Sequence, residues 1–308
     1  MTYSQDQVIT VSDFNSMVND TNGVVATGTG SSGYGEVPIA TVSQGEIITS
    51  AKITELRNTI NTAANHQGTT VNIPPVANLE ASDTAIAHIP ATDTYDIPTA
   101  ITAITTNVNN VAGDSLALVS NAHTVTARSS NWSGEINAEA KAIFPSEDAT
   151  RHFFNSGGEI RIDFHHPNSA SSPGQDNAWR SGISNMGTII FGFNGTTRTG
   201  SAGTPNTGFG YYNLTSGFNQ IFNGTNILSG AYSTNDIYVD ARYTSGTYVG
   251  GNGAKGREIE FRFRLVDQHS SYEDVVASGT NVKLSYKYAA TYLSNISTPT
   301  FSNLANVF

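Results

Sequence analysis

The residues best suited to chemistry are histidines that lie close to a carboxylate near the middle of the chain. His165 and His166 follow Asp163 almost directly, and His152 precedes them. Imidazole nitrogens and carboxylate oxygens are common transition-metal ligands. Adjacent residues of a β-strand point to opposite faces, so His165 and His166 cannot share one ion if the strand continues through them. We therefore predict solvated histidines at a strand end before Pro167, and no metal site.

Other motifs of catalysis or cofactor binding are weak. No GxSxG motif stands at a strand-to-helix turn. Two glycine-rich loops, Gly28–Tyr34 and Gly250–Gly256, suggest phosphate binding, but the first has no lysine and the second lacks the Gly-Lys-Ser/Thr order. We expect the first loop to be a flexible turn. Paired carboxylates for glycoside hydrolysis stay open as an alternative, because they are recognised by their separation in space. We predict no catalytic residue and no cofactor.

Aromatic side chains are frequent in the second half of the chain. Aromatic rings stack on sugars and anchor protein interfaces, but most large rings on strands are buried. We expect these rings to fill the core or a sheet edge, with a sugar-binding surface as the alternative. The rings concerned are Phe209, Tyr211, Tyr212, Tyr232, Tyr238 and Tyr243.

The composition excludes several classes of protein. Of the 308 residues only 13% are charged, the formal net charge is -10, and there is no cysteine. Phosphate backbones bind basic patches, so we expect no nucleic-acid partner. Disulfides and thiolate metal sites are impossible. We also expect no signal peptide and no membrane insertion, because no stretch has the required apolar length.

The most sharply patterned stretch is Ser146–Phe164, with the sequence SEDATRHFFNSGGEIRIDF. Ser146 can cap a helix whose apolar face carries Phe153 and Phe154. Gly157 and Gly158 end that helix, since glycine tolerates the left-handed conformation. Apolar and polar residues then alternate, as in a half-buried strand. We predict an architectural corner from helix to strand.

The first 70 residues predict a small helical module. Ser12 can cap a first helix, and Thr49 or Ser50 can open a second helix that Gly68 ends. Ile53, Leu56 and Ile60 share one face of the second helix. Because two helices bury little alone, we expect this face to attach the module to a neighbouring subunit or another protein.

Residues 71–123 predict a linker that begins with prolines and includes a short helix. Its apolar residues follow heptad spacing, which in a coiled coil with isoleucine at both core positions favours a trimer. The alternative is an ordinary amphipathic helix that packs on its own domain, since the pattern is short for a coiled coil. The possible trimer seam comprises Ile97, Ile101, Ile104, Val108 and Val111.

From residue 124 the chain alternates between apolar and polar residues in many short segments. The clearest is Arg257–Val266, in which Ile259, Phe261, Phe263 and Leu265 share one face. Further strands are expected at 135–142, 188–193, 209–212, 237–243 and 282–288. Many strands separated by Gly and Asn turns indicate an antiparallel β-sandwich.

Three parts of the sequence resemble virion structural proteins of tailed phages, particularly marine T4-like phages of cyanobacteria. The resemblance covers residues near 11–68, 131–164 and 280–304, including the run RHFFNSGGEIRIDF. It implies a structural role in the particle and brings no catalytic residues with it. The interval 165–255 is where the resemblance is weakest.

We therefore expect a mainly β protein with three parts: a helical attachment module at 1–70, a linker with a short helix at 71–123, and a β-sandwich domain at 124–308. The expected function is a non-enzymatic structural component of a tailed-phage virion, in the tail, baseplate, neck or a fibre, assembled in the host cytoplasm. Its expected partners are other virion proteins and copies of itself. The alternatives are a carbohydrate-binding adhesin that contacts a host-surface glycan and, third, a polysaccharide-degrading enzyme.

Overall fold

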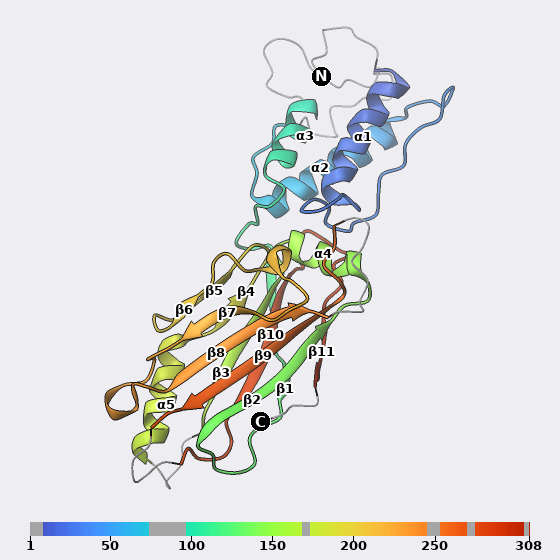
Figure 1. The fold of residues 1–308 in the computed structure, drawn as a ribbon. Helices are drawn as coiled ribbons and strands as arrows, with labels where there is room; N and C mark the ends of the chain where they lie inside the picture. The colour runs from blue at the N-terminus through green and yellow to red at the C-terminus, as the bar shows by residue number, and fades with distance from the viewer. Residues whose placement is uncertain (1–8, 74–96, 168–172, 245–252, 270–274, 305–307) are drawn as a thin grey trace. The chain divides into compact units, whose positions relative to one another are not determined.

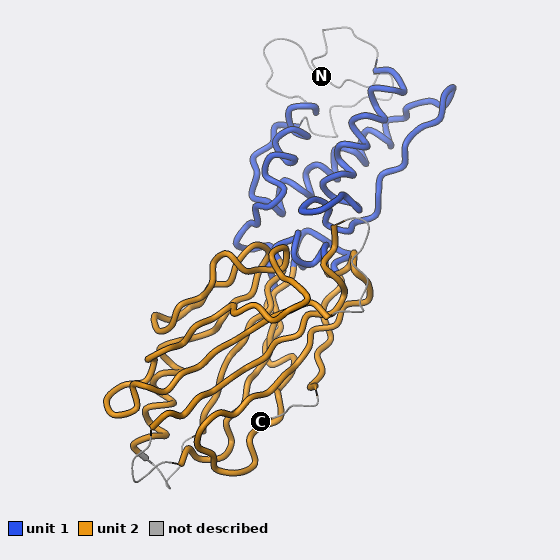
Figure 2. Tube along the Cα trace, in the orientation of Figure 1, with its two compact units in different colours: residues 1–117, 151–157, 289–296 blue, residues 118–150, 158–288, 297–308 orange. Residues whose placement is uncertain are grey.

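The chain forms two compact units, each built from segments that are far apart in the sequence (Figure 2). The first takes Met1–Ala117, Arg151–Gly157 and Ala289–Ile296, and the second takes Leu118–Thr150, Gly158–Tyr288 and Ser297–Phe308. The computed structural model describes residues 9–73, 97–167, 173–244, 253–269, 275–304 and 308. The stretch from Pro74 to Pro90 in the predicted linker and the start of the glycine-rich loop at 250 lie outside these residues.

The first unit is helical in its described part. Its first helix begins with a capping box: the Thr10 hydroxyl accepts the backbone N–H of Asp13 at 3.2 Å, and the Asp13 carboxylate accepts the backbone N–H of Thr10 at 3.0 Å. The cap predicted at Ser12 is wrong, because Thr10 has the acid three residues later that completes this reciprocal pair. The helices are α1 (Val11–Val25), α2 (Ser50–Gln67) and α3 (Ile97–Thr106) (Figure 1).

Helix α2 begins and ends where the sequence predicts. Thr49 caps it by accepting a backbone N–H of the first turn, and Gly68 ends it in the left-handed conformation at φ +67°. Ile53, Leu56 and Ile60, which the sequence analysis assigned to attachment, are 1%, 0% and 0% exposed. Their side chains lie in the core of the first unit, so this face of α2 is covered by the chain itself.

Helix α3 contains the start of the possible trimer seam. Ile97, Ile101 and Ile104 are 1%, 5% and 0% exposed and lie in the same core as the apolar faces of α1 and α2. The helix ends before Val108 and Val111, so the five seam residues do not form one helical stripe. The heptad spacing is thus explained by the alternative, an amphipathic helix that packs within its own domain. A trimer stays a prediction without this seam to support it.

The second unit contains two antiparallel sheets. The five-stranded sheet has the order β1 (Leu116–Val125), β10 (Asn281–Ala289), β3 (Glu159–His165), β4 (Ile189–Phe191) and β5 (Thr196–Arg198). The six-stranded sheet has the order β11 (Thr300–Asn303), β2 (Gly134–Ile143), β9 (Glu258–Asp267), β8 (Asp236–Tyr243), β7 (Asn219–Gly224) and β6 (Thr204–Pro205).

Alternation in the sequence places the core of the second unit correctly. Ile259, Phe261, Phe263 and Leu265 on β9 are all 0% exposed. Rings from the two sheets meet edge to face, with centroids 5.9 Å apart for Phe164 and Phe263, and 5.5 Å apart for Phe191 and Phe261. Such pairs add about 0.5 to 1.5 kcal/mol beyond the apolar area that they bury.

Several elements differ from the sequence prediction, among them strands β5, β6, β7 and β11, which were not predicted. Strand β1 occupies the end of the predicted linker, and helix α5 (Pro173–Met186) occupies a region for which no element was predicted. The strand predicted at 209–212 is wrong, because a single 3₁₀ turn, η2 (Tyr211–Asn213), lies there. A second such turn, η3 (Gly230–Tyr232), precedes β8.

The corner predicted at Ser146–Phe164 is present. The Ser146 hydroxyl accepts the backbone N–H of Ala149 at 3.1 Å at the start of helix α4 (Glu147–Asn155). Phe153 and Phe154 are both fully buried. Gly157 then adopts φ +81°, and β3 begins two residues later. The chain passes from the first unit to the second after Gly157.

Gly157→Ala is expected to destabilise the protein for two separable reasons. A left-handed conformation costs an L-residue about 1 to 2 kcal/mol, and an added Cβ would overlap Val111 Cγ2. Urea unfolding measures the total, and the cost should shrink when Val111→Ala is also present. Gly45→Ala is the matched control, since Gly45 is also left-handed, at φ +88°, but has no atom within 4 Å of the added Cβ. Equal losses of unfolding free energy for Gly157→Ala and Gly45→Ala would contradict the contribution from the overlap with Val111.

Candidate functional site

The two histidines after Asp163 lie in different environments. His165 is exposed at the end of β3, whereas His166 is 5% exposed, so the two side chains occupy different environments. His152 belongs to the first unit, where its ring lies 3.1 Å from the Thr27 carbonyl. Within the described ranges, no group of three or more His, Cys, Asp or Glu is arranged to hold a metal ion.

His166 lies in a buried chain of polar groups. Its Nε2 is 2.9 Å from Asp176 Oδ1 on α5, and its Nδ1 is 2.8 Å from Thr280 Oγ1. The backbone N–H of Ala277 also donates to Asp176 Oδ1, at 3.1 Å. The prediction that His166 is solvated is wrong, because α5, which the sequence analysis missed, carries the carboxylate that pairs with it.

The order Thr280, His166, Asp176 resembles the nucleophile, base and acid of a catalytic triad. Thr280 has no exposed surface, however, so its hydroxyl does not face a substrate. Burial lowers the pKa of His166, and the hydrogen bond to Asp176 acts in the opposite direction. The contacts link α5 to the ends of β3 and β10, which is a structural role.

An open hollow of about 610 Å³ lies beside this buried chain in the second unit. Only His166 of the buried polar chain reaches its wall, and the charged and hydroxyl side chains around it are exposed at the surface. Such a wall can bind a polar ligand weakly, and none of the described hydrogen bonds of its histidines goes to one of its serines. The lining residues are Phe164, His165, His166, Arg180, Ser181, Ile183, Ser184 and Asn185.

The first glycine-rich loop surrounds a buried arginine of α4. The Arg151 guanidinium, 0% exposed, donates to the carbonyls of Thr27, Gly30 and Ser32. Asn155, one helical turn later, donates from Nδ2 to the carbonyls of Gly30, Ser32 and Gly33 at 3.0 to 3.1 Å. The loop therefore turns carbonyl oxygens toward a cation, whereas a phosphate cradle needs backbone N–H groups.

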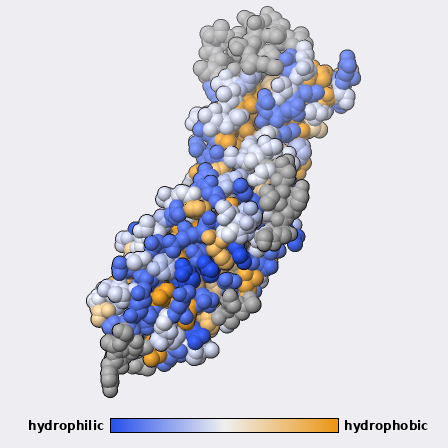
Figure 3. All heavy atoms as spheres, in the orientation of Figure 1, coloured by the Kyte–Doolittle hydropathy of each residue, from blue (hydrophilic) through white to orange (hydrophobic). Residues whose placement is uncertain are grey.

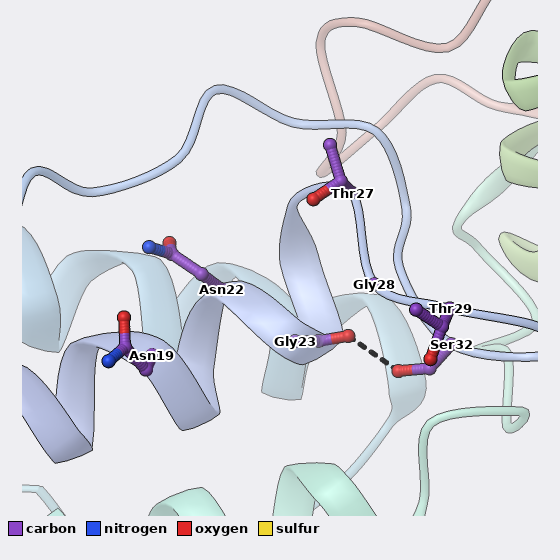
Figure 4. Close-up of a pocket in the computed structure, with 7 residues that line it drawn as sticks. All are labelled: Asn19, Asn22, Gly23, Thr27, Gly28, Thr29 and Ser32. Atoms are coloured by element: carbon purple, nitrogen blue, oxygen red, sulfur yellow. Dashed lines mark hydrogen bonds between the residues drawn. The ribbon is translucent and has the colours of Figure 1, made fainter. Parts of the chain in front are cut away.

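The prediction of a flexible turn is wrong for this loop, because donors from α4 hold it from inside. Against its outer side lies a polar hollow of about 350 Å³ (Figure 4). The Ser32 hydroxyl donates to the Gly23 carbonyl at 2.5 Å across this hollow. Its wall has amides and hydroxyls but no charged side chain, which disfavours an anion site. The lining residues are Asn19, Asn22, Gly23, Thr27, Gly28, Thr29 and Ser32.

A segment after this loop is fastened to α1 by two asparagines, and we call it the latched segment, residues 36–48. Asn22 bonds both the N–H and the carbonyl of Ile39, each at 2.9 Å. Asn15 bonds both groups of Val42, each at 2.8 Å. Each amide thus replaces the backbone partner that a neighbouring strand would supply.

The latched segment exposes apolar side chains. Val37 is 74% exposed and Ile47 is 79% exposed. The carboxylate of Glu36, at its start, accepts four hydrogen bonds from the backbone and side chains of Ser294 and Asn295, at 2.6 to 3.0 Å. Val37 and Ile47 lie on a segment that hydrogen bonds hold in place, which lowers the entropy cost of binding another protein.

The outer face of β8 and β9 carries a network of arginines and acids. Asp240 accepts from Arg262 and Arg264 at 2.9 and 3.2 Å, and the guanidinium groups of Arg242 and Arg262 lie 4.2 and 4.3 Å from the centre of the Phe218 ring. In Figure 3, hydrophilic residues predominate over the visible surface of these strands. The charged side chains named here on this face are already paired with groups of the same chain.

The rings considered for sugar binding are not free platforms. Tyr211 is fully buried, and Arg264 lies over the Tyr238 ring at 4.7 Å. Phe209, Tyr212, Tyr232 and Tyr243 are all half-buried.

Sequence patterns did not identify most of the residues that organise these sites. Arg151 and Asn155 did carry a signal, since their spacing of four places both on one side of a short helix just before a glycine. Asp176 carried none, because its distance from His166 along the chain does not indicate contact.

The first unit also contains a buried histidine, His66 on α2. Its Nδ1 lies 2.5 Å from Ser115 Oγ, and the edge of its ring contacts Tyr34 with centroids 4.8 Å apart. Its Nε2 is buried without a described hydrogen-bond partner. Burial lowers the pKa of His66 to about 4, while the negative charge of Glu36 acts weakly in the opposite direction.

His66 is expected to make the protein less stable in acid. The folded pKa of His66, about 4, lies below the usual 6.5. The contribution of its neutral ring to the free energy of unfolding is therefore complete above pH 6.5 and is lost as the pH falls from 6.5 to 4. The difference corresponds to roughly 3 kcal/mol. An NMR titration should find His66 neutral down to about pH 5.

The matched stability test is urea unfolding across the same pH window. His66→Phe should flatten the pH dependence. Titration of the His66 ring near its usual value would contradict the burial argument.

Comparison with known proteins does not supply a function. No protein-family model, curated protein or solved structure that was compared matches this chain. No described helix combines the length and the apolar character that a membrane span needs. The function has to be argued from the residues themselves.

Proposed function

We propose that this protein is a structural component of a tailed-phage virion, in the tail, baseplate, neck or a fibre, and acts by binding other virion proteins. The sequence resemblance to such proteins motivates the proposal. The observation that carries it is the latched segment, because two of the four exposed large apolar side chains in the described ranges, Val37 and Ile47, lie on it. Exposed apolar side chains on a backbone that is already held in place lose less entropy when they bind a partner.

The polar groups that could do chemistry support the same proposal. Arg151, His166 and Asp176 are buried, and their described bonds tie segments of the chain together. We infer that the protein works without a cofactor and is incorporated into particles in the host cytoplasm.

We also infer that the two antiparallel sheets pack face to face as a β-sandwich. The edge-to-face contacts of Phe164 with Phe263 and of Phe191 with Phe261 support this arrangement, since each joins a strand of one sheet to a strand of the other. A stiff sandwich in the same chain as a helical module with an apolar binding segment suits an assembled particle.

The alternative of a carbohydrate-binding adhesin has less support. Sugar stacking requires an open ring face, and the rings of Phe218 and Tyr238 are covered by the chain's own arginines. Binding of the purified protein to host lipopolysaccharide would favour that alternative.

The test is incorporation into particles. In a phage that encodes this chain, the double variant Val37→Asp and Ile47→Asp should reduce the amount in purified particles by roughly tenfold, as a loss of 1.4 kcal/mol in binding would. The readout is quantitative mass spectrometry of the particles. Val275→Asp is the matched control, because Val275 is also exposed, at 44%, but lies in the second unit.

Circular dichroism of the purified variants checks that both remain folded. Absence of the wild-type protein from particles would contradict the proposed function. Normal incorporation of the folded double variant would show that the latched segment is not part of the interface.

A further inference from the structure

The outer strands of the two sheets differ greatly in length. In the described sheets these outer strands are β1, β5, β6 and β11. β5 has 3 residues, β6 has 2 and β11 has 4, whereas β1 has 10. Short edge strands offer little template for pairing, which is one way in which proteins avoid edge-to-edge association. Only β1 lacks this protection.

β1 also lacks the side chains that usually protect an edge. From Ser115 to Ala127 the sequence SLALVSNAHTVTA has no Asp, Glu, Lys, Arg or Pro. Natural edge strands use lysine, inward charges, proline or bulges to prevent pairing. One irregularity is present: Asn121 has φ +52°, and its N–H donates to Ser285 Oγ on β10 at 3.0 Å. That bond is made to β10, the strand that β1 pairs with.

The exposed side chains of β1 are small or apolar. Leu118 is 51% exposed, and Ser120, Ala122 and Thr124 are also exposed. On the inner side, the His123 ring stacks on Phe301 and its Nε2 lies 2.8 Å from Asn303 Oδ1 on β11. The strand is thus fixed from within while its outer backbone has no neighbouring strand among the described residues.

The occupant that best fits this edge is the same strand of a second copy. If two copies of β1 pair antiparallel about a twofold axis, a residue near the axis lies opposite the same residue of the second copy, or opposite its neighbour. A charge near the axis would therefore face a like charge. β1 has none, although the chain as a whole carries a net charge of -10. An uncharged strand can therefore meet its own copy without repulsion.

The nearest charged strand does not oppose this pairing. Lys283 and Lys287 lie on β10, the next strand inward. Across the pair, the two β10 strands would be three strand spacings apart, about 14 Å. That distance exceeds the screening length of about 8 Å at physiological salt.

We propose that β1, with Ser120 at the twofold axis, pairs antiparallel with β1 of a second copy and joins two five-stranded sheets into one continuous sheet. This self-association does not rest on the proposed function. It also does not use the isoleucines of the predicted trimer seam, which are buried inside the chain.

The test is the oligomeric state of the full chain in solution. Wild-type protein should be dimeric by light scattering at micromolar concentration. Ser120→Lys, at the middle of β1, should weaken the dimer about tenfold, because like charges would face each other across the axis. Ser216→Lys is the matched control, since it adds the same charge at an exposed residue away from β1.

Mixing charge variants makes the test specific for strand pairing. Ser120→Glu alone should also weaken the dimer, but an equimolar mixture of Ser120→Lys and Ser120→Glu should form a heterodimer, detected by native mass spectrometry. Monomeric wild-type protein would overturn the proposal, as would a dimer or trimer unaffected by Ser120→Lys. A monomeric wild type whose Ser120→Lys variant fails to enter particles would instead assign the edge to a different virion protein.

Discussion

The first unit depends on the hydrogen bonds between one buried guanidinium and the carbonyl oxygens of a glycine-rich loop. Arg151 cannot be buried alone, because an uncompensated charge in the interior is strongly unfavourable. The carbonyls of Thr27 and Ser32, in turn, need donors once they are turned inward. Each partner therefore requires the other, and the helices of residues 11–106 are completed by a short helix that the chain supplies much later.

In this protein, hydrogen bonds between amides and carbonyls hold loops in place where other proteins use ion pairs. Asn15 and Asn22 hold the latched segment, and Asn155 holds the glycine-rich loop. Neutral hydrogen bonds are insensitive to the ionic strength that weakens surface salt bridges. The low charge content of the sequence is thus reflected in how its loops are fastened.

Sequence patterns predicted the elements whose two faces differ sharply, and missed the others. Strand β9 was predicted well because every second residue is apolar and fully buried. Strand β1 was missed because apolar and polar residues do not alternate along its sequence: Leu118 is exposed, whereas His123 is half-buried. Helix α5 was missed because glycines and serines interrupt its apolar face, although Trp179 is fully buried on it. The pairing of His166 with Asp176 followed from neither pattern, since it depends on where α5 packs.

The four hydrogen bonds that Ser294 and Asn295 donate to Glu36 can form only after nearly the whole chain has been synthesised. The first unit stays incomplete until residue 296 has left the ribosome, long after its helices have been made. At about 5 to 20 residues per second, the roughly 180 residues between Ala117 and Ile296 take about 10 to 35 seconds to add. During that interval α1, α2 and α3 can pack on one another, but Glu36 lacks the donors of Ser294 and Asn295. The first unit therefore completes its hydrogen bonds only after most of the second unit has been synthesised.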